Sequence, residues 1–234
     1  MSNRPISEAA APSKKRTVLS KPLSDQFNDA LVYAATLHRT QPRKGRDIPY
    51  IGHLLGVASL VLEAGGDEDM AIAALLHDAV EDQGGRPRLD EIEHKFGRRV
   101  ARIVLGCTDS DAVDPSQKLP WCERKVQYIA HVKNEAEAEV RLVSVADKVH
   151  NARAILTDFH DTGPSVFDRF SGKKDGTLWY YRSLVEAFRA AEARDGSPTD
   201  LPARGRRRLI DELDRVTSEL ERLAGGKGVN PCHA

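Results

Sequence analysis

The sequence predicts an all-α protein, and three observations support this prediction. Apolar residues recur at helical spacing along most of the chain, and no convincing alternating strand pattern exceeds a few residues. Glycine, proline and capping residues divide the chain into segments of helix length. With 234 residues and 12 prolines, the chain is long enough for one sizeable domain with its own core.

The expected helices follow from these signals in order along the chain. Ser24 or Asp25 caps the first helix, and Asp67 caps the third, which Gly84 and Gly85 stop. The polar segment at residues 109–119 is expected to be a loop over or beside a functional site. The predicted helical ranges are 25–38, 51–64, 68–83, 89–96, 98–107, 121–133, 140–156, 178–192 and 206–224.

Four regions are expected. Residues 1–22 form a flexible leader, because they lack the apolar segment of a secretory signal. Residues 23–194 form the main domain, residues 195–224 a linker and an amphipathic helix, and residues 225–234 a disordered tail. The last helix carries leucine and valine at heptad-like spacing, which favours packing on the domain over a dimer-forming coil, although a homodimer stays open.

Composition narrows the classes of function. The 35 basic and 35 acidic side chains cancel, so no global field attracts the protein to nucleic acid or to a membrane. The longest strongly apolar run, residues 71–76, is far shorter than the roughly 20 residues of a membrane-spanning helix. Cys107, Cys122 and Cys232 are odd in number and widely spaced, which argues against a disulfide framework and favours the cytoplasm.

The segment AALLHDAVED, residues 73–82, places acidic residues directly behind an apolar run. On a helix, Asp78, Glu81 and Asp82 share one face, with His77 at its edge. Burying such a cluster without compensation would cost several kcal/mol for each carboxylate. A divalent cation removes that penalty, so the segment predicts a metal site.

Two further residues complete a candidate ligand set. His53 lies at the start of the preceding helix, and Asp147 lies in the apolar segment LVSVADKVHNARAI. Together with His77 and Asp78 they offer two nitrogens and two oxygens, which suit manganese, iron or zinc better than calcium or magnesium. Each residue alone has an ordinary structural explanation. A purely structural explanation of all four, however, requires four independent coincidences.

Three ordered segments, HRTQPRKGRDIPYIGH, AALLHDAVED and VADKVHNARAI, resemble the HD-domain hydrolase module of the RelA/SpoT proteins, above all its stand-alone small alarmone hydrolases. The resemblance covers about residues 25–190. It implies an HD-domain helical bundle with an additional C-terminal helix, and a manganese-dependent 3′-pyrophosphohydrolase that degrades guanosine tetra- and pentaphosphate. Another divalent transition metal is the alternative cofactor.

The resemblance also implies roles for individual residues. His53, His77, Asp78 and Asp147 match the metal ligands, and Glu81 and Asp82 match the pair that handles the attacking water. Arg43, Lys44, Asn151 and Arg153 match residues that bind the nucleotide substrate.

The chain departs from the family pattern in three places. Ala154 stands where a threonine is frequent, the loop at residues 109–119 is longer, and residues 167–184 differ. The aromatics Trp179, Tyr180 and Tyr181 in the last segment are expected to pack in the core rather than to contact nucleotide. Two alternatives to the pyrophosphohydrolase remain. One is a phosphatase acting on NADPH or an adenine alarmone, and the other is a regulator that binds alarmone without cleaving it.

Overall fold

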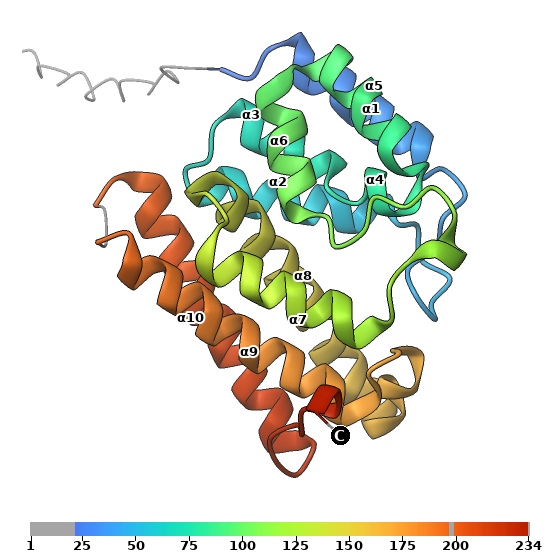
Figure 1. Cartoon of the computed structure of the whole chain (residues 1–234), viewed down its shortest axis with the longest axis vertical. Coiled ribbons are helices and arrows are strands. Elements are labelled where there is room, and N and C mark those ends of the chain that lie inside the picture. Colours follow the sequence, from blue (N-terminus) through green and yellow to red (C-terminus); the bar gives the residue numbers. More distant parts are fainter. Residues whose placement is uncertain (1–21, 197–198, 234) are drawn as a thin grey trace, which may run out of the picture.

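The computed structural model describes residues 22–196 and 199–233, and within these ranges the chain is helical without a β-strand (Figure 1). The prediction of an all-α protein is therefore confirmed. A single isolated bridge joins Pro42 and Pro49 in the loop after the first helix. Most of the expected leader, residues 1–21, lies outside the described residues.

Ten α-helices lie in the described part of the chain, and three of them begin after a residue whose side chain caps the first turn. Ser24 accepts a hydrogen bond from the backbone N–H of Gln26, and Asp67 accepts one from Met70. Three short 3-10 helices, η1 (Pro115–Gln117), η2 (Gly163–Arg169) and η3 (Pro231–His233), lie between and after them. The α-helices are α1 (Asp25–Leu37), α2 (Ile51–Glu63), α3 (Glu68–Leu76), α4 (Ala79–Asp82), α5 (Gly85–Phe96), α6 (Arg98–Cys107), α7 (Trp121–Asn134), α8 (Ala138–Thr162), α9 (Lys173–Arg194) and α10 (Leu201–Leu223).

The helix expected over residues 68–83 is interrupted at His77 and Asp78. Helix α3 ends at Leu76, and the four-residue helix α4 begins at Ala79. The backbone of Asp78 departs from ideal helical angles, with φ −93° and ψ −5°. The acidic segment is therefore a turn between two helices, where adjacent side chains can be aimed at one centre.

Helix α8 forms the middle of the molecule. It contacts α2, α3 and α6 on one side and α10 on another, and Figure 1 shows it between the group formed by α1 to α6 and the antiparallel pair α9–α10. Its apolar residues Leu142, Val145, Ala146 and Val149 are fully buried. Because α8 also carries Asp147, the functional segment of this helix is held rigidly by the core.

Helix α10 begins five residues earlier than expected. The proline and glycine before Arg206 favour a linker, but Pro202 occupies the first turn of α10, where a proline is tolerated. Gly205 lies directly on the end of α2, since a Cβ there would be 2.0 Å from the carbonyl oxygen of Ala64. The packing of α10 on the domain is confirmed, because Leu209, Leu213 and other stripe residues are buried against α8 and α9.

A buried ion network joins α8, α9 and α10. Glu192 accepts hydrogen bonds from Arg206, and Arg141 lies 3.4 Å from the same carboxylate. All three side chains are nearly inaccessible to solvent. Removing one member would leave a buried charge without compensation, so the network specifies how α10 packs.

The expectations of a disordered tail and of no disulfide framework are both corrected. Residues 225–233 lie against α9, where Gly228 approaches so closely that a Cβ would be 2.2 Å from the carbonyl oxygen of Asp175. Cys232 forms a disulfide with Cys122 of α7, across a sequence separation of 110 residues. Spacing along the chain could not reveal this pair, because the fold brings the two cysteines together. Cys107 is a free thiol.

Among the described residues, the helices are too short or too polar to cross a membrane.

Candidate metal centre and cavity

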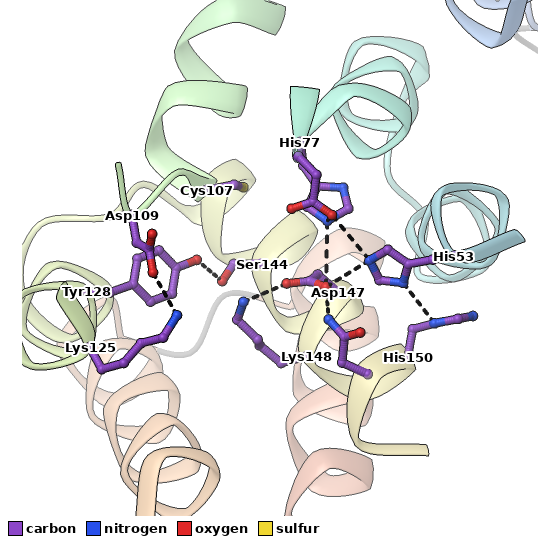
Figure 2. A network of polar contacts seen from close by, with 12 residues as sticks. His53, His77, Cys107, Asp109, Lys125, Tyr128, Ser144, Asp147, Lys148 and His150 are labelled. Carbon is purple, nitrogen blue, oxygen red and sulfur yellow. Dashed lines mark hydrogen bonds and ion pairs between the residues drawn. The ribbon is translucent and has the colours of Figure 1, made fainter. Parts of the chain in front are cut away.

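Four predicted ligands converge on one point between α2, α3 and α8. Figure 2 labels three of them, His53, His77 and Asp147. The Nε2 atom of His53 lies 3.2 Å from Asp147 Oδ1 and 3.5 Å from Asp78 Oδ2. The Nε2 atom of His77 lies 3.0 Å from Asp78 Oδ2 and 3.6 Å from Asp147 Oδ1. The structure thus brings together residues that lie up to 94 positions apart in the sequence.

This centre has the chemistry of a metal site. His53, His77 and Asp147 are buried, and their ligand atoms all lie within 4.8 Å of one another. The Nε2 atoms of both histidines are buried and have no hydrogen-bond partner. Since buried polar atoms are nearly always paired, two such nitrogens beside two carboxylates fit a divalent cation. The residues present therefore suit the metal that the sequence predicts.

Neighbouring groups hold each ligand in place. The Tyr50 hydroxyl donates to Asp78 Oδ2 at 2.6 Å, and the Nδ1 atom of His77 lies 2.8 Å from the carbonyl oxygen of Ala74. The ammonium of Lys148 lies 2.6 Å from Asp147 Oδ2. Such outer contacts orient ligating side chains and fix the tautomer of ligating histidines.

The charges of the centre favour ionised carboxylates. Burial alone would raise the pKa of Asp78, but the nearby imidazoles of His77 and His53 hold it well below the usual range. For Asp147, burial is likewise outweighed by Lys148 and the two imidazoles, so its pKa is also well below the usual range. Both residues are therefore in the form that ligates a cation.

Glu81 and Asp82, the pair predicted to handle water, lie in α4 directly after Asp78. Burial raises the pKa of Glu81 to about 7, with a further contribution from the Asp109 charge. Burial and the Asp78 charge also raise the pKa of Asp82, whose carboxylate accepts a hydrogen bond from Gln41 at 2.8 Å. A carboxylate with a pKa near neutrality is suited to exchange a proton with water.

The loop at residues 109–119 lies beside the centre, as expected. Its Lys118 ammonium lies 3.1 Å from the backbone carbonyl oxygen of Glu81. At the start of the loop, Asp109 pairs with Arg124 and Lys125 of α7, each at 2.6 Å. These cations hold the pKa of Asp109 at about 2 against the effect of burial. The loop thus fixes a group of positive charges next to Glu81.

A cavity of about 620 Å³ opens over the centre and reaches His53 and Glu81. Its wall combines cations with aromatic rings, a combination that suits a phosphorylated nucleotide. The other residues that line it include Arg43, Lys44, Arg46, Ile48, Tyr50, Trp121, Arg124, Lys125, Lys148, His150, Asn151, Ala154, Ile155, Asp158, Arg169, Phe170, Tyr180 and Tyr181.

Three of the four predicted substrate-binding residues lie in this wall. Arg43 donates to the Asn151 side-chain oxygen at 2.6 Å, and Lys44 is exposed near the Phe170 ring. Arg153 is not among the lining residues, because its guanidinium bonds Glu212 of α10 at 2.6 and 2.9 Å. Asn151 and Arg153 are two positions apart on α8, so their side chains leave the helix in different directions. The family pattern alone did not distinguish these directions.

Sequence reasoning missed several groups at this site. Lys118, Arg124 and Asp109 left no signal, since charged residues in a loop and on a helix face are usually solvated. Tyr50 and Lys148 adjoin predicted residues, but which way they point depends on the fold. Tyr180 and Tyr181 are buried, as expected of core aromatics, and they also line the cavity.

A helical fold with paired imidazoles and carboxylates at the end of a basic cavity defines a metal-dependent phosphohydrolase of the HD class. The family model of the HD domain matches residues 30–178. The chain therefore belongs to the HD-domain family.

Named relatives place the chain more closely. It is 39% identical over 131 residues to guanosine-3′,5′-bis(diphosphate) 3′-pyrophosphohydrolase MESH1 of Mus musculus. The aligned segment covers 55% of this chain and 68% of the relative. The Danio rerio MESH1 is 40% identical over 124 residues, which is 52% of this chain and 64% of that protein. The chain is thus a hydrolase of the MESH1-like branch of the HD-domain family.

Solved structures agree with this placement. The structure of a metazoan orthologue of SpoT, described as hydrolysing ppGpp, matches with a TM-score of 0.65 at 28% identity, covering 86% of this chain and 98% of that one. A Listeria monocytogenes protein matches with a TM-score of 0.59 at 28% identity, covering 72% and 97%.

Proposed function

We propose that this protein hydrolyses guanosine 3′,5′-bis(diphosphate) and its pentaphosphate analogue to GDP or GTP and pyrophosphate. The observation that carries the proposal is the convergence of His53, His77, Asp78 and Asp147 beneath a cavity lined by cations and aromatic rings. The named relatives, which are pyrophosphohydrolases of this substrate, support the choice of nucleotide.

In the proposed mechanism, water attacks the phosphorus attached to the 3′ oxygen, and the bond between that oxygen and phosphorus breaks. Arg43 and Lys44 bind the phosphate oxygens, and the hydrogen bond to Asn151 sets the direction of the Arg43 side chain. Glu81 accepts a proton from the attacking water, with Asp82 beside it. The departing 3′ oxygen takes up a proton, which completes the nucleoside diphosphate.

The proposed cofactor is Mn²⁺, held by His53, His77, Asp78 and Asp147, and other divalent transition metals suit the same donors. When bound, the cation stabilises the negative charge that develops on the phosphoryl oxygens. We place the protein in the cytoplasm because its proposed substrate is a guanine nucleotide. The cysteines no longer favour this compartment, since Cys122 and Cys232 form a disulfide.

Product analysis tests the proposal. Purified protein is incubated with guanosine tetraphosphate and Mn²⁺, nucleotides are separated by ion exchange, and pyrophosphate is measured by a coupled pyrophosphatase assay. We expect GDP and pyrophosphate in equal amounts, and no turnover with excess chelator or in Asp78→Asn.

Other results would favour a different function. Release of orthophosphate from NADPH, without pyrophosphate from the guanine nucleotide, would indicate a phosphatase. Tight binding of guanosine tetraphosphate without turnover in Mn²⁺ would indicate a non-catalytic regulator.

A further inference from the structure

His150 of α8 contacts His53 on the side that faces away from the centre (Figure 2). The Nδ1 atoms of the two rings lie 2.9 Å apart. The other nitrogen of His53, Nε2, lies 3.2 Å from Asp147 Oδ1 and points into the centre. The two ring nitrogens of His53 therefore face different partners.

The chemistry of imidazole assigns a direction to this hydrogen bond. A nitrogen that ligates a cation carries no proton, so a neutral His53 that ligates through Nε2 carries its proton at Nδ1. His53 Nδ1–H then donates to His150 Nδ1, which accepts. The second histidine of the centre is held in the same way, since the Nδ1 atom of His77 lies 2.8 Å from the Ala74 carbonyl oxygen. His53 differs in that a side chain supplies the acceptor.

A glycine provides the space for this side chain. Gly56 lies in the interior of α2, three residues after His53, and a Cβ there would be 2.3 Å from Cδ2 and Nε2 of His150. Glycine weakens a helix interior relative to alanine. At Gly52, in the first turn of the same helix, a Cβ would meet no atom within 4 Å. The close approach at Gly56 is therefore specific to the His150 ring.

We propose that His150 is a positioning residue that fixes the tautomer and the ring orientation of His53, and that Gly56 is required because it lets the His150 ring reach His53. The inference rests on the proposed metal centre but is independent of which nucleotide is cleaved. It assigns His150, which lines the cavity, a role toward the ligand rather than toward the substrate.

Metal affinity without substrate tests the role of His150. Titration calorimetry with Mn²⁺ alone is expected to show binding about 10- to 100-fold weaker in His150→Phe, which keeps a ring but supplies no acceptor. His150→Gln, which offers an amide oxygen, should recover most of the affinity. Circular dichroism and thermal unfolding establish that each variant is folded.

Gly56→Ala tests the same contact without changing either histidine. It should weaken Mn²⁺ binding as His150→Phe does, whereas the matched control Gly52→Ala should leave Mn²⁺ affinity unchanged. In the double variant Gly56→Ala/His150→Phe the two effects should not add, because both remove one hydrogen bond.

Nitrogen-15 NMR of the imidazoles provides a readout that a general structural effect would not move. With Zn²⁺ as a diamagnetic replacement, His53 should carry its proton at Nδ1 in the wild type, and this proton should exchange faster in His150→Phe. Wild-type Mn²⁺ affinity in both His150→Phe and Gly56→Ala, or a His53 proton at Nε2, would overturn the inference. If the wild type binds no metal, the proposed metal centre is refuted as well. If the wild type binds Mn²⁺ and the variants bind it with the same affinity, only the role of His150 is refuted.

Discussion

The Lys118 ammonium lies 3.1 Å from the backbone carbonyl oxygen of Glu81 and 3.5 Å from its carboxylate. The loop at residues 109–119 thereby holds a cation against the proposed base. Burial and the Asp109 charge favour the protonated form of Glu81, while Lys125 and Lys118 favour the ionised form, and the pKa of Glu81 is about 7 as a result. The activity of the protein should therefore depend on pH near neutrality.

We expect kcat/KM to rise with pH through about 7, because Glu81 accepts a proton only when ionised and is protonated below its pKa. Lys118→Met should move this limb to higher pH, since one of the two lysines that lower the pKa of Glu81 is removed. Glu81→Gln should lower kcat by about 10²- to 10⁴-fold and remove the limb. The measurement is a pH–rate profile of the three proteins at saturating Mn²⁺. An identical limb in Lys118→Met and the wild type would contradict this assignment.

The two arginines predicted to bind substrate should behave differently. Arg43→Ala should raise KM by roughly 10-fold or more, because a charged hydrogen bond contributes about 1.5–3 kcal/mol. Arg153→Ala is the matched comparison and should change KM by less than about 2-fold, since its guanidinium bonds Glu212 outside the cavity. Steady-state kinetics of both variants decide the matter. An equal increase in KM in both variants would show that Arg153 also binds the substrate.

Gly205→Ala should destabilise the protein although alanine favours helices. The added Cβ would lie 2.0 Å from the Ala64 carbonyl oxygen, and backbone cannot move aside as a flexible side chain can. We expect a loss of about 1–3 kcal/mol in the free energy of unfolding, measured by urea denaturation. Arg215→Ala in the same helix, whose side chain is 71% exposed, is the control and should stay within about 0.5 kcal/mol. A stabilised Gly205→Ala would refute the close packing of α10 on α2.

The Cys122–Cys232 disulfide should stabilise the oxidised protein. It closes a loop of 110 residues, and removing such a bond typically costs about 2–5 kcal/mol. Thermal unfolding should show a lower Tm for Cys232→Ser than for the oxidised wild type. A dithiol reductant should lower the Tm of the wild type but leave that of the variant unchanged. Equal responses of the two proteins to reductant would show that the bond does not form in solution.

Local signals made the helices predictable. Capping residues such as Ser24 and Asp67 act within one turn, so the sequence reveals where α1 and α3 begin. The ligand set was predictable for a different reason, because four costly polar residues in apolar segments have a common explanation in a cation. The convergence of His53, His77, Asp78 and Asp147 confirms that they lie together.

The features that sequence reasoning missed depend on contacts between distant segments. Pro202 and Gly205 predicted a linker by local rules, but the packing of α10 on α2 and α8 decided otherwise. The pairing of Cys122 with Cys232 and the contact of Lys118 with Glu81 likewise exist only in the folded chain. A helical pattern fixes which residues share a face, but not which neighbour that face meets.

The family match ends at residue 178, yet α9 and α10 bury Leu184, Phe188 and Leu213 in the same interior as the ligand-bearing helix α8. A domain boundary placed at residue 178 would divide this shared core and expose to water the face of α8 that packs on α9 and α10. Shortened versions made for crystallisation, or fusions that transplant the catalytic module, therefore have to retain α9 and α10, and the chain through Cys232 where the disulfide is to be kept.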